Sequence, residues 1–162
     1  MRKLVFFCPL LLIGGTVPSW ADGAATLPES VVVTATRTPE PLDLTGSSVS
    51  VITATDLQTQ QILALSDALA GTPGVVINRN GGVGETTSLS LRGSAAGQSV
   101  VLIDGVRIND ASAPNGQAVL EDLMVNNISR VEILRGPQST LYGSDAIGGV
   151  VNILTKRGGD TP

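Results

Sequence analysis

The stretch VEILRGPQSTLYGSDAIGGVVNILTK, residues 131–156, decides the fold class of this chain. Its apolar start belongs to a strand predicted over 125–136, which turns at a Gly-Pro pair. STLYGSDA (139–146) predicts a short helical turn, and GGVVNILTK (148–156) predicts a further strand. Two strands joined by a short helical turn are typical of a domain that mixes a β-sheet with short helices.

The same mixture of strands and loops continues upstream. SVVLIDGVRIN (99–109) predicts a β-hairpin, because its two apolar runs flank Asp104-Gly105, a pair suited to a type I′ turn. Further strands are predicted over 48–53, 75–78 and 88–93, and long loops over 78–87, 94–98 and 109–118.

Helical spacing of apolar residues occurs between the first two of these strands. Residues 55–75 predict two short helices, the second capped by Ser66 and stopped by Gly71 and Pro73. The fold class expected from these elements is a small α+β domain, in which a mixed β-sheet carries short helices and long loops.

The N-terminus reads as a secretory signal peptide over residues 1–21. Arg2 and Lys3 precede an apolar run from Leu4 to Val17, and small residues at the end place cleavage after Ala21. The apolar run is too short to span a bilayer well. The one cysteine of the chain, Cys8, lies in this leader.

The composition of the remaining chain excludes several kinds of chemistry. Without Arg2 and Lys3 the 10 basic residues fall to 8 against 14 acidic ones, a net charge of −6, which argues against a nucleic-acid partner. No His and no Cys remain. The sequence therefore predicts no ordinary zinc site, no His-activated nucleophile and no disulfide.

Two motifs that suggest catalysis have simpler explanations. NGGVGETT (80–87) lacks the Lys-Ser/Thr ending of a phosphate-binding P-loop, and is interpreted as an exposed loop. Glu121 and Asp122 are adjacent in sequence and so point apart, which does not suit a catalytic carboxylate pair. We expect no enzymatic activity, no protein-held metal and no cofactor.

Arg92 and Arg135 each follow an apolar strand and precede a glycine, as SLSLRG and VEILRGP. Two solvated surface arginines are the simplest interpretation. The repeated arrangement also places two guanidinium groups at strand ends, where each suits bidentate pairing with a carboxylate. Glu132 and Asp145 are the local candidates, and a carboxylate on another structure is the alternative.

Four blocks in order give the chain a family resemblance. They are ESVVVTATR, NGGVGETTSLSLRG, VVLIDGVRIN and VEILRGPQSTLYGSDAIGGVVNILTK, and they cover about 29–157. Together they resemble the N-terminal plug domain of TonB-dependent outer-membrane receptors, with the closest likeness to the vitamin B12 (cobalamin) receptor type. SAAGQ (94–98) and NDASAPNGQA (109–118) depart from the cobalamin pattern, which leaves a ferric siderophore as the other ligand class.

The resemblance implies that ESVVVTA is the TonB box, the segment that pairs edge-to-edge with the energy-transducing protein TonB. Such β-augmentation needs an extended strand with free backbone groups on a flexible tether. The alternative from the residues alone is a strand that completes the domain's own sheet. The TonB box would comprise Glu29, Ser30, Val31, Val32, Val33, Thr34 and Ala35.

The resemblance also implies a domain organisation. After the signal peptide, 22–47 is expected to be a flexible segment in which prolines block regular structure, 48–157 the plug, and 158–162 the start of a linker. In the family the plug sits inside a C-terminal β-barrel of about 22 strands, which this chain lacks. The chain would then be a fragment of a longer product or a stand-alone plug.

Roles for individual residues follow from the same resemblance. Arg92 and Arg135 would be plug-to-barrel latches facing acidic residues of the barrel wall. The loops 79–87, 94–98 and 109–117 would look outward and help bind a metal-chelate ligand. The candidates for that contact are Thr86, Ser88, Asn109 and Asp110.

The function expected is that of a plug in an outer-membrane transporter for cobalamin or a ferric siderophore. Its partners would be TonB, the barrel, the ligand and, through the barrel, the outer membrane. The alternative is a stand-alone periplasmic ligand-binding module without transport. An enzyme is the third and weakest hypothesis.

Overall fold

The computed structural model describes residues 31–32, 34, 36–82 and 84–157. The expected signal peptide and the expected linker at 158–162 lie outside these residues. Within them, no helix is long and apolar enough to cross a membrane.

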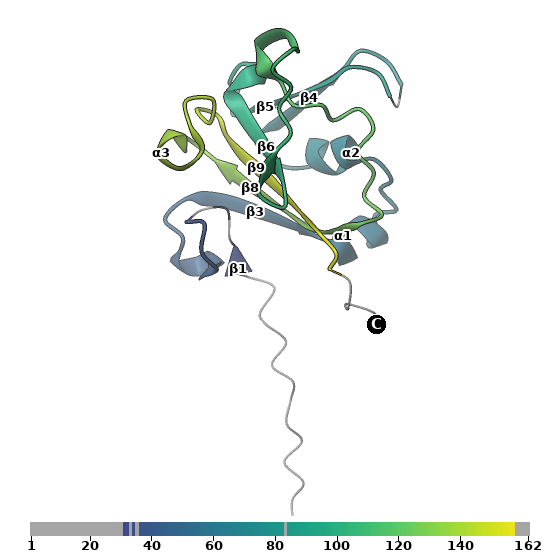
Figure 1. Ribbon diagram of the computed structural model, residues 1–162. Helices are drawn as coiled ribbons and strands as arrows, with labels where there is room; N and C mark the ends of the chain where they lie inside the picture. Colours follow the sequence, from purple (N-terminus) through teal and green to yellow (C-terminus); the bar gives the residue numbers. More distant parts are fainter. Residues whose placement is uncertain (1–30, 33, 35, 83, 158–162) are drawn as a thin grey trace, which may run out of the picture.

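A five-stranded mixed sheet forms the centre of the domain (Figure 1). Its strand order is β3-β8-β9-β6-β7, and only the β6–β9 pair within it is parallel. The strands are β3 (Ser48–Thr53), β6 (Ser99–Ile103), β7 (Val106–Arg107), β8 (Ile128–Arg135) and β9 (Gly149–Thr155). The predicted α+β class is confirmed.

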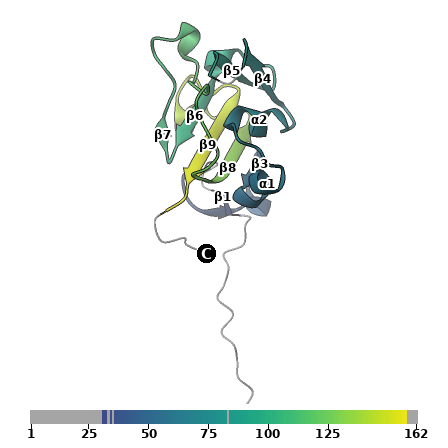
Figure 2. The same cartoon turned by 90° about the vertical axis from the view of Figure 1, so that its right-hand side faces the viewer.

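Two helices and a separate hairpin cover one face of the sheet. Figure 2, seen from that side, shows α1 and α2 in front of the sheet. These elements are α1 (Ala54–Thr59), α2 (Leu65–Ala70) and the antiparallel pair β4 (Val75–Arg79) and β5 (Thr87–Leu91). The main apolar core lies between them and the inward side chains of β6, β8 and β9, and includes Leu57, Leu69, Leu91, Ile133 and Val151.

The other face of the sheet carries a smaller apolar cluster around Leu134 and Val150. The N-terminal hairpin lies at this side of the molecule, together with α3 (Ser139–Tyr142). In the hairpin, β1 (Val31–Val32) pairs antiparallel with β2 (Glu40–Pro41). Val32 has none of its surface exposed.

Sequence patterns located the strands well, and the hairpin turn is confirmed in detail. Asp104 and Gly105 have φ angles of 49° and 85°. Positive φ at both central residues is the type I′ geometry that favours this dipeptide between two strands. The carboxylate of Asp104 also accepts hydrogen bonds from the backbone N–H and hydroxyl of Thr155, at 2.9 and 2.6 Å. These bonds lower the pKa of Asp104, with the hydroxyl the larger cause.

The predicted cap of the second helix was wrong. Ala64 occupies the N-cap position of α2, and Ser66 lies inside the helix, buried, with its hydroxyl accepting a hydrogen bond from the Arg79 guanidinium. A true capping box begins α1 instead. There the Thr53 hydroxyl accepts from the Asp56 N–H at 3.2 Å, while the Asp56 carboxylate accepts from the Thr53 N–H at 2.9 Å.

The expectation that prolines block regular structure before residue 47 was also wrong. Pro41 lies in β2, and the 3₁₀ turn η1 (Leu42–Leu44) follows it directly. A proline is tolerated at the edge of a two-stranded pairing and immediately before a 3₁₀ turn, because neither position needs its missing N–H. Two further 3₁₀ turns among the described residues are η2 (Ala96–Gln98) and η3 (Pro114–Gly116).

Candidate functional site

The two predicted latch arginines lie side by side at one end of the sheet. Arg92 follows β5 and Arg135 ends β8. Gly74 lies between them, and the backbone N–H of Arg92 donates to the Gly74 carbonyl at 2.8 Å. A Cβ on residue 74 would lie 3.4 Å from Arg135 Cδ and 3.8 Å from Arg92 Cγ. The fold therefore brings together two cations that are 43 residues apart in the chain.

Arg135 is held by uncharged acceptors. Its guanidinium donates to the Pro73 carbonyl and, at 2.7 Å, to the Ser50 hydroxyl. Its Nε is buried and has no hydrogen-bond partner among the described residues. Arg92 is exposed. The site thus presents one guanidinium held by hydrogen bonds and one on an exposed side chain.

The local carboxylates proposed for these arginines bind other partners. The Glu132 carboxylate lies 2.9 Å from Arg130 Nε, and the Asp145 carboxylate lies 2.6 Å from an Arg107 nitrogen. In the part of the chain that the structure describes, neither Arg92 nor Arg135 forms an ion pair. Both guanidinium groups remain suited to a carboxylate from outside these residues.

The candidate ligand-contacting loops gather at the end of the molecule opposite β1 and the C-terminal end of β9 (Figures 1 and 2). Thr86 is exposed in the loop between β4 and β5. Ser88 lies inside β5, partly buried, and its hydroxyl makes a long contact of 3.5 Å with the Asn78 carbonyl. Thr86 therefore has the more accessible hydroxyl of the two.

Asn109 has a structural task that the sequence did not reveal. Its Oδ1 accepts from the Val101 N–H at 3.0 Å, and its Nδ2 donates to the carbonyls of Ser99 and Gly116 at 3.2 and 2.9 Å. The side-chain amide therefore ties the loop after β7 to strand β6. An Asn placed directly after a hairpin strand is the only signal in the sequence for this role.

Asp110 also uses its carboxylate within the loop. It accepts from the N–H and the hydroxyl of Ser112, both at 2.7 Å. The hydrogen bond from the Ser112 hydroxyl is the largest cause that lowers the pKa of Asp110, and the bond from the Ser112 N–H is the next. The charge of Asp110 therefore lies in the loop that follows β7.

The predicted TonB box is only partly described. Glu29, Ser30, Val33 and Ala35 lie outside the described residues. Val31 and Val32 form β1. Thr34 is fully buried, and both its N–H and its hydroxyl donate to the carboxylate of Glu132, at 2.9 and 2.5 Å. Sequence reasoning missed this role of Glu132, although an acidic residue inside the apolar run VEIL was a signal for it.

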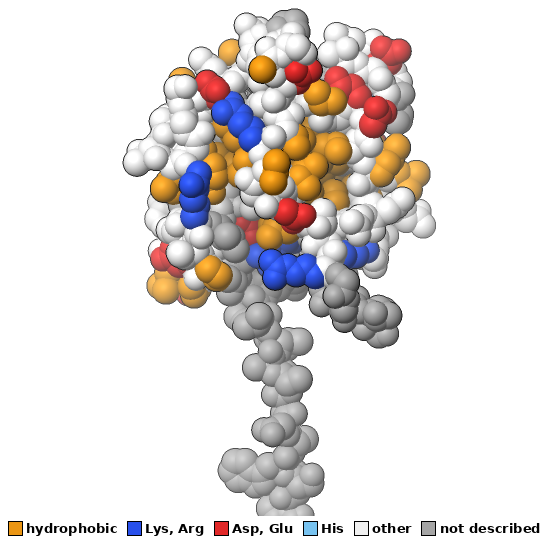
Figure 3. Space-filling view, in the orientation of Figure 1, with side chains coloured by type: hydrophobic (Ala, Val, Ile, Leu, Met, Phe, Trp, Pro, Cys, Tyr) orange, Lys and Arg blue, Asp and Glu red, His pale blue; other side chains and the backbone are white. Residues whose placement is uncertain are grey.

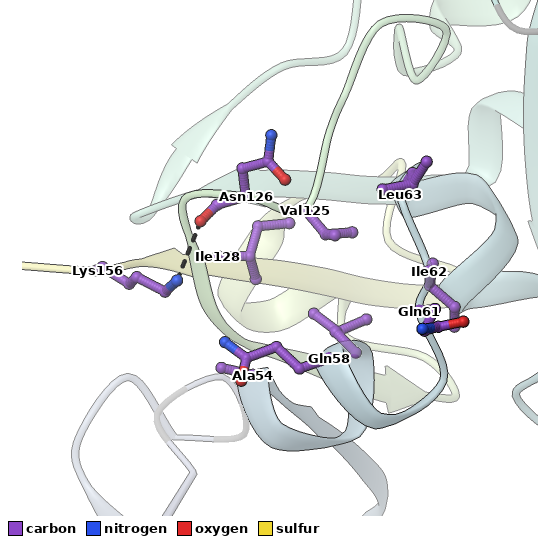
Figure 4. A pocket seen from close by; sticks show the side chains of 10 residues that line it. Ala54, Gln58, Gln61, Ile62, Leu63, Val125, Asn126, Ile128 and Lys156 are labelled. Atoms are coloured by element: carbon purple, nitrogen blue, oxygen red, sulfur yellow. Dashed lines mark hydrogen bonds between the residues drawn. The ribbon is translucent and has the colours of Figure 1, made fainter. Parts of the chain in front are cut away.

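Four pockets on the described surface are lined by residues other than Arg92 and Arg135. Figure 4 shows a pocket of about 330 Å³ between α1 and the segment before β8. Its polar side chains are amides and one amine, and Lys156 Nζ donates to the Asn126 carbonyl at 3.0 Å. Lys156 carries the one ionisable side chain of this lining.

One face of the molecule carries an apolar patch. Figure 3 shows hydrophobic side chains gathered in the middle of the face seen in Figure 1, with basic side chains to the left and below and acidic ones at the upper right. Within the described ranges, no group of three His, Cys, Asp or Glu side chains could hold a metal ion.

Comparison of the sequence with protein families identifies the family of this chain. The chain matches the TonB-dependent Receptor Plug Domain over residues 41–150, more than half of its length, and it belongs to that family. The family consists of domains of transport receptors and is not enzymatic.

Solved receptors give the same result. The ferric yersiniabactin uptake receptor FyuA from Yersinia pestis is 31% identical over 71% of this chain and 18% of its own, with a TM-score of 0.54. The alcaligin outer-membrane receptor FauA from Bordetella pertussis is 28% identical over 79% of this chain and 21% of its own, with a TM-score of 0.64. The chain therefore spans only a small part of the receptors it matches.

A third receptor supports the fold alone. The ferripyoverdine receptor of the outer membrane of Pseudomonas aeruginosa has a TM-score of 0.64 at 21% identity, covering 78% of this chain and 16% of its own. These solved relatives are siderophore receptors and not cobalamin receptors. The expected likeness to the cobalamin receptor type is therefore not supported.

Proposed function

We propose that this chain is the plug of a TonB-dependent outer-membrane receptor that imports a ferric siderophore. Its membership of the plug family carries the proposal. The ligand class rests on the solved relatives, which include receptors for ferric yersiniabactin and alcaligin. The iron would arrive inside the ligand, as cargo, and the protein itself would hold no metal.

The proposal assigns ligand contact to one end of the domain and contact with TonB to the other end. The loops that carry Thr86 and Asp110 would contact the ligand at the outer end, with Asn109 fixing the shape of its loop. At the other end, residues 29–35 would be the TonB box, which TonB engages by β-augmentation. Ligand binding would shift the population in which this segment is free.

Arg92 and Arg135 would hold the plug against acidic residues of the surrounding barrel wall. The support is their geometry: both side chains pass beside Gly74, and neither forms an ion pair with a carboxylate of the described residues. The Nε of Arg135 is buried without a hydrogen-bond partner among the described residues, and an unpaired buried polar group is costly. A carboxylate supplied by the barrel would remove that cost and fix the plug in the pore.

Replacing one latch arginine tests the plug role. We expect Arg135→Ala to increase passive entry of large antibiotics severalfold, because the plug then loses a contact with the wall. The measurement is antibiotic susceptibility, together with dye influx, in cells that make equal amounts of each variant. Arg157→Ala is the matched control, since that exposed arginine lies beyond the opposite end of β9. Equal permeability of both variants and the wild type would remove the latch role.

A further inference from the structure

Two Asn-Gly dipeptides lie in loops of this domain. Asn80-Gly81 begins the loop between β4 and β5, and Asn115-Gly116 lies in η3. Both asparagines are exposed. An asparagine before glycine loses its side-chain amide more readily than one before other residues, because glycine has no side chain to hinder attack by its own backbone nitrogen. The two dipeptides are identical, so a difference in their reactivity has to come from the structure.

The dipeptide Asn80-Gly81 is held at one point only. The loop that it begins lies at the upper right of Figure 1, and the backbone N–H of Asn80 donates to the Thr86 carbonyl across it at 3.1 Å. Within the described residues, neither the Asn80 side-chain amide nor the Gly81 N–H has a hydrogen-bond partner. A Cβ on Gly82 would meet no heavy atom within 4 Å. The Gly81 nitrogen and the Asn80 side chain are therefore free to approach each other.

The dipeptide Asn115-Gly116 is restrained on both sides of its peptide bond. The Gly116 N–H, whose nitrogen would have to attack, donates to the Ala113 carbonyl at 2.9 Å. Asn115 has a φ of 62°, and its carbonyl packs so closely on Gly97 that a Cβ at residue 97 would collide with the oxygen. Rotation about the Cα–C bond of Asn115, which ring closure requires, would move both of these atoms. The structure therefore protects Asn115.

The Asp104-Gly105 turn is restrained in another way. An aspartate before glycine isomerises through the same ring closure. Here the backbone N–H and the hydroxyl of Thr155 donate to the two oxygens of the Asp104 carboxylate. These bonds favour the ionised carboxylate, which is a poor target for a nucleophile. Among these three dipeptides, Asn80-Gly81 is the least restrained.

We propose that Asn80 is a site of selective, spontaneous deamidation. The Gly81 nitrogen attacks Cγ of Asn80, the Cγ–Nδ2 bond breaks, and the amide nitrogen leaves as ammonia together with the proton from Gly81. The product is a cyclic imide. Water then opens the ring at either of its carbonyls and leaves an aspartyl or an isoaspartyl residue. Solvent water is the only co-reactant.

The reaction changes both the charge and the backbone of the loop. A carboxylate at residue 80 adds a negative charge near Glu85, whose carboxyl carbon would lie 3.4 Å from a Cβ on Gly81. An isoaspartyl linkage also lengthens the main chain by one carbon, directly after the residue that bonds the Thr86 carbonyl. The inference does not depend on the proposed function, although Thr86 is one of the candidate ligand contacts.

Peptide mapping measures the reaction separately at each dipeptide. Cleavage by trypsin after Arg79 and Arg92 releases peptide 80–92, in which Asn80 is the only asparagine, whereas Asn115 lies in peptide 108–130. The intact, detergent-solubilised protein is incubated at mildly alkaline pH, once folded and once in guanidinium chloride. Mass spectrometry then counts the acid forms, and fragment masses locate them in peptides left uncut at Arg79. An unincubated sample gives the background, and circular dichroism checks that the folded sample remains folded.

In the folded protein, we expect Asn80 to react at nearly the rate measured in guanidinium chloride. Asn115 should react about three- to tenfold more slowly than in guanidinium chloride, the factor that corresponds to one net hydrogen bond. Asn80→Gln is the control variant, because its longer side chain closes the ring slowly, and it should show no acid form at residue 80.

Two results would overturn the proposal. One is a folded protein without acid forms at residue 80 under conditions in which the unfolded chain makes them. The other is equal protection of Asn80 and Asn115 by folding, which would show that the structure does not select between the two dipeptides.

Discussion

Deletion of residues 29–35 is expected to abolish energy-dependent uptake of the ferric siderophore while leaving its binding at the cell surface intact. TonB would lose the strand on which it pulls, whereas the outward loops around Thr86 and Asp110 would be unchanged. Accumulated iron should fall to the level of cells without TonB. The measurement is uptake of radioactive iron as the siderophore complex, with binding scored separately at 4 °C in energy-depleted cells.

The matched control for this deletion removes seven other residues. Deletion of 22–28 shortens the chain by the same amount and leaves the TonB box in place. It should retain most of the uptake. A parallel assay with labelled cobalamin should show no change in either variant. Retained iron uptake after loss of 29–35 would contradict the transport proposal and favour a ligand-binding module.

Gly149→Ala is expected to lower the free energy of unfolding by about 3 kcal/mol. Gly149 begins β9 with φ at 146°, a backbone conformation that side chains strongly disfavour. An added Cβ would lie 2.2 Å from the Leu134 carbonyl oxygen and 2.8 Å from Leu91 Cδ1. The first of these atoms is backbone, so β8 and β9 would have to separate at the start of their pairing.

Urea unfolding of the purified protein, followed by circular dichroism, measures this loss. Gly46→Ala is the control, because a Cβ at residue 46 meets no heavy atom within 4 Å. That change should alter the free energy of unfolding by less than about 0.5 kcal/mol. Identical urea midpoints for the two variants would show that the close approach of β8 to Gly149 is unimportant for stability.

Sequence patterns predicted the local elements because each depends on near neighbours. The strand at Ser48–Thr53 was predicted with its observed bounds, and the turn at Asp104-Gly105 follows from two residues that tolerate positive φ. The pairing of β6 with β9 was not predictable in this way. It joins parallel strands about 50 residues apart, and no local pattern encodes such a partner choice.

Residues of the candidate site were predictable only where a sequence motif contained them. The strand-Arg-Gly repeat pointed to Arg92 and Arg135, and the structure places them together. The tasks of Asn109 and Glu132 escaped prediction because each side chain bonds groups that approach it only in the folded chain. Ser66 was misassigned for the same reason: its hydroxyl accepts from Arg79 instead of capping a helix.

The central claim is that this chain acts as the plug of a receptor in the outer membrane. The most direct test is the apparent mass of the native gene product, detected with an antibody to residues 48–157, in isolated outer membranes with and without heating. The account predicts a heat-modifiable band several times larger than the 16.5 kDa of this chain. A small band in the soluble periplasmic fraction would contradict it.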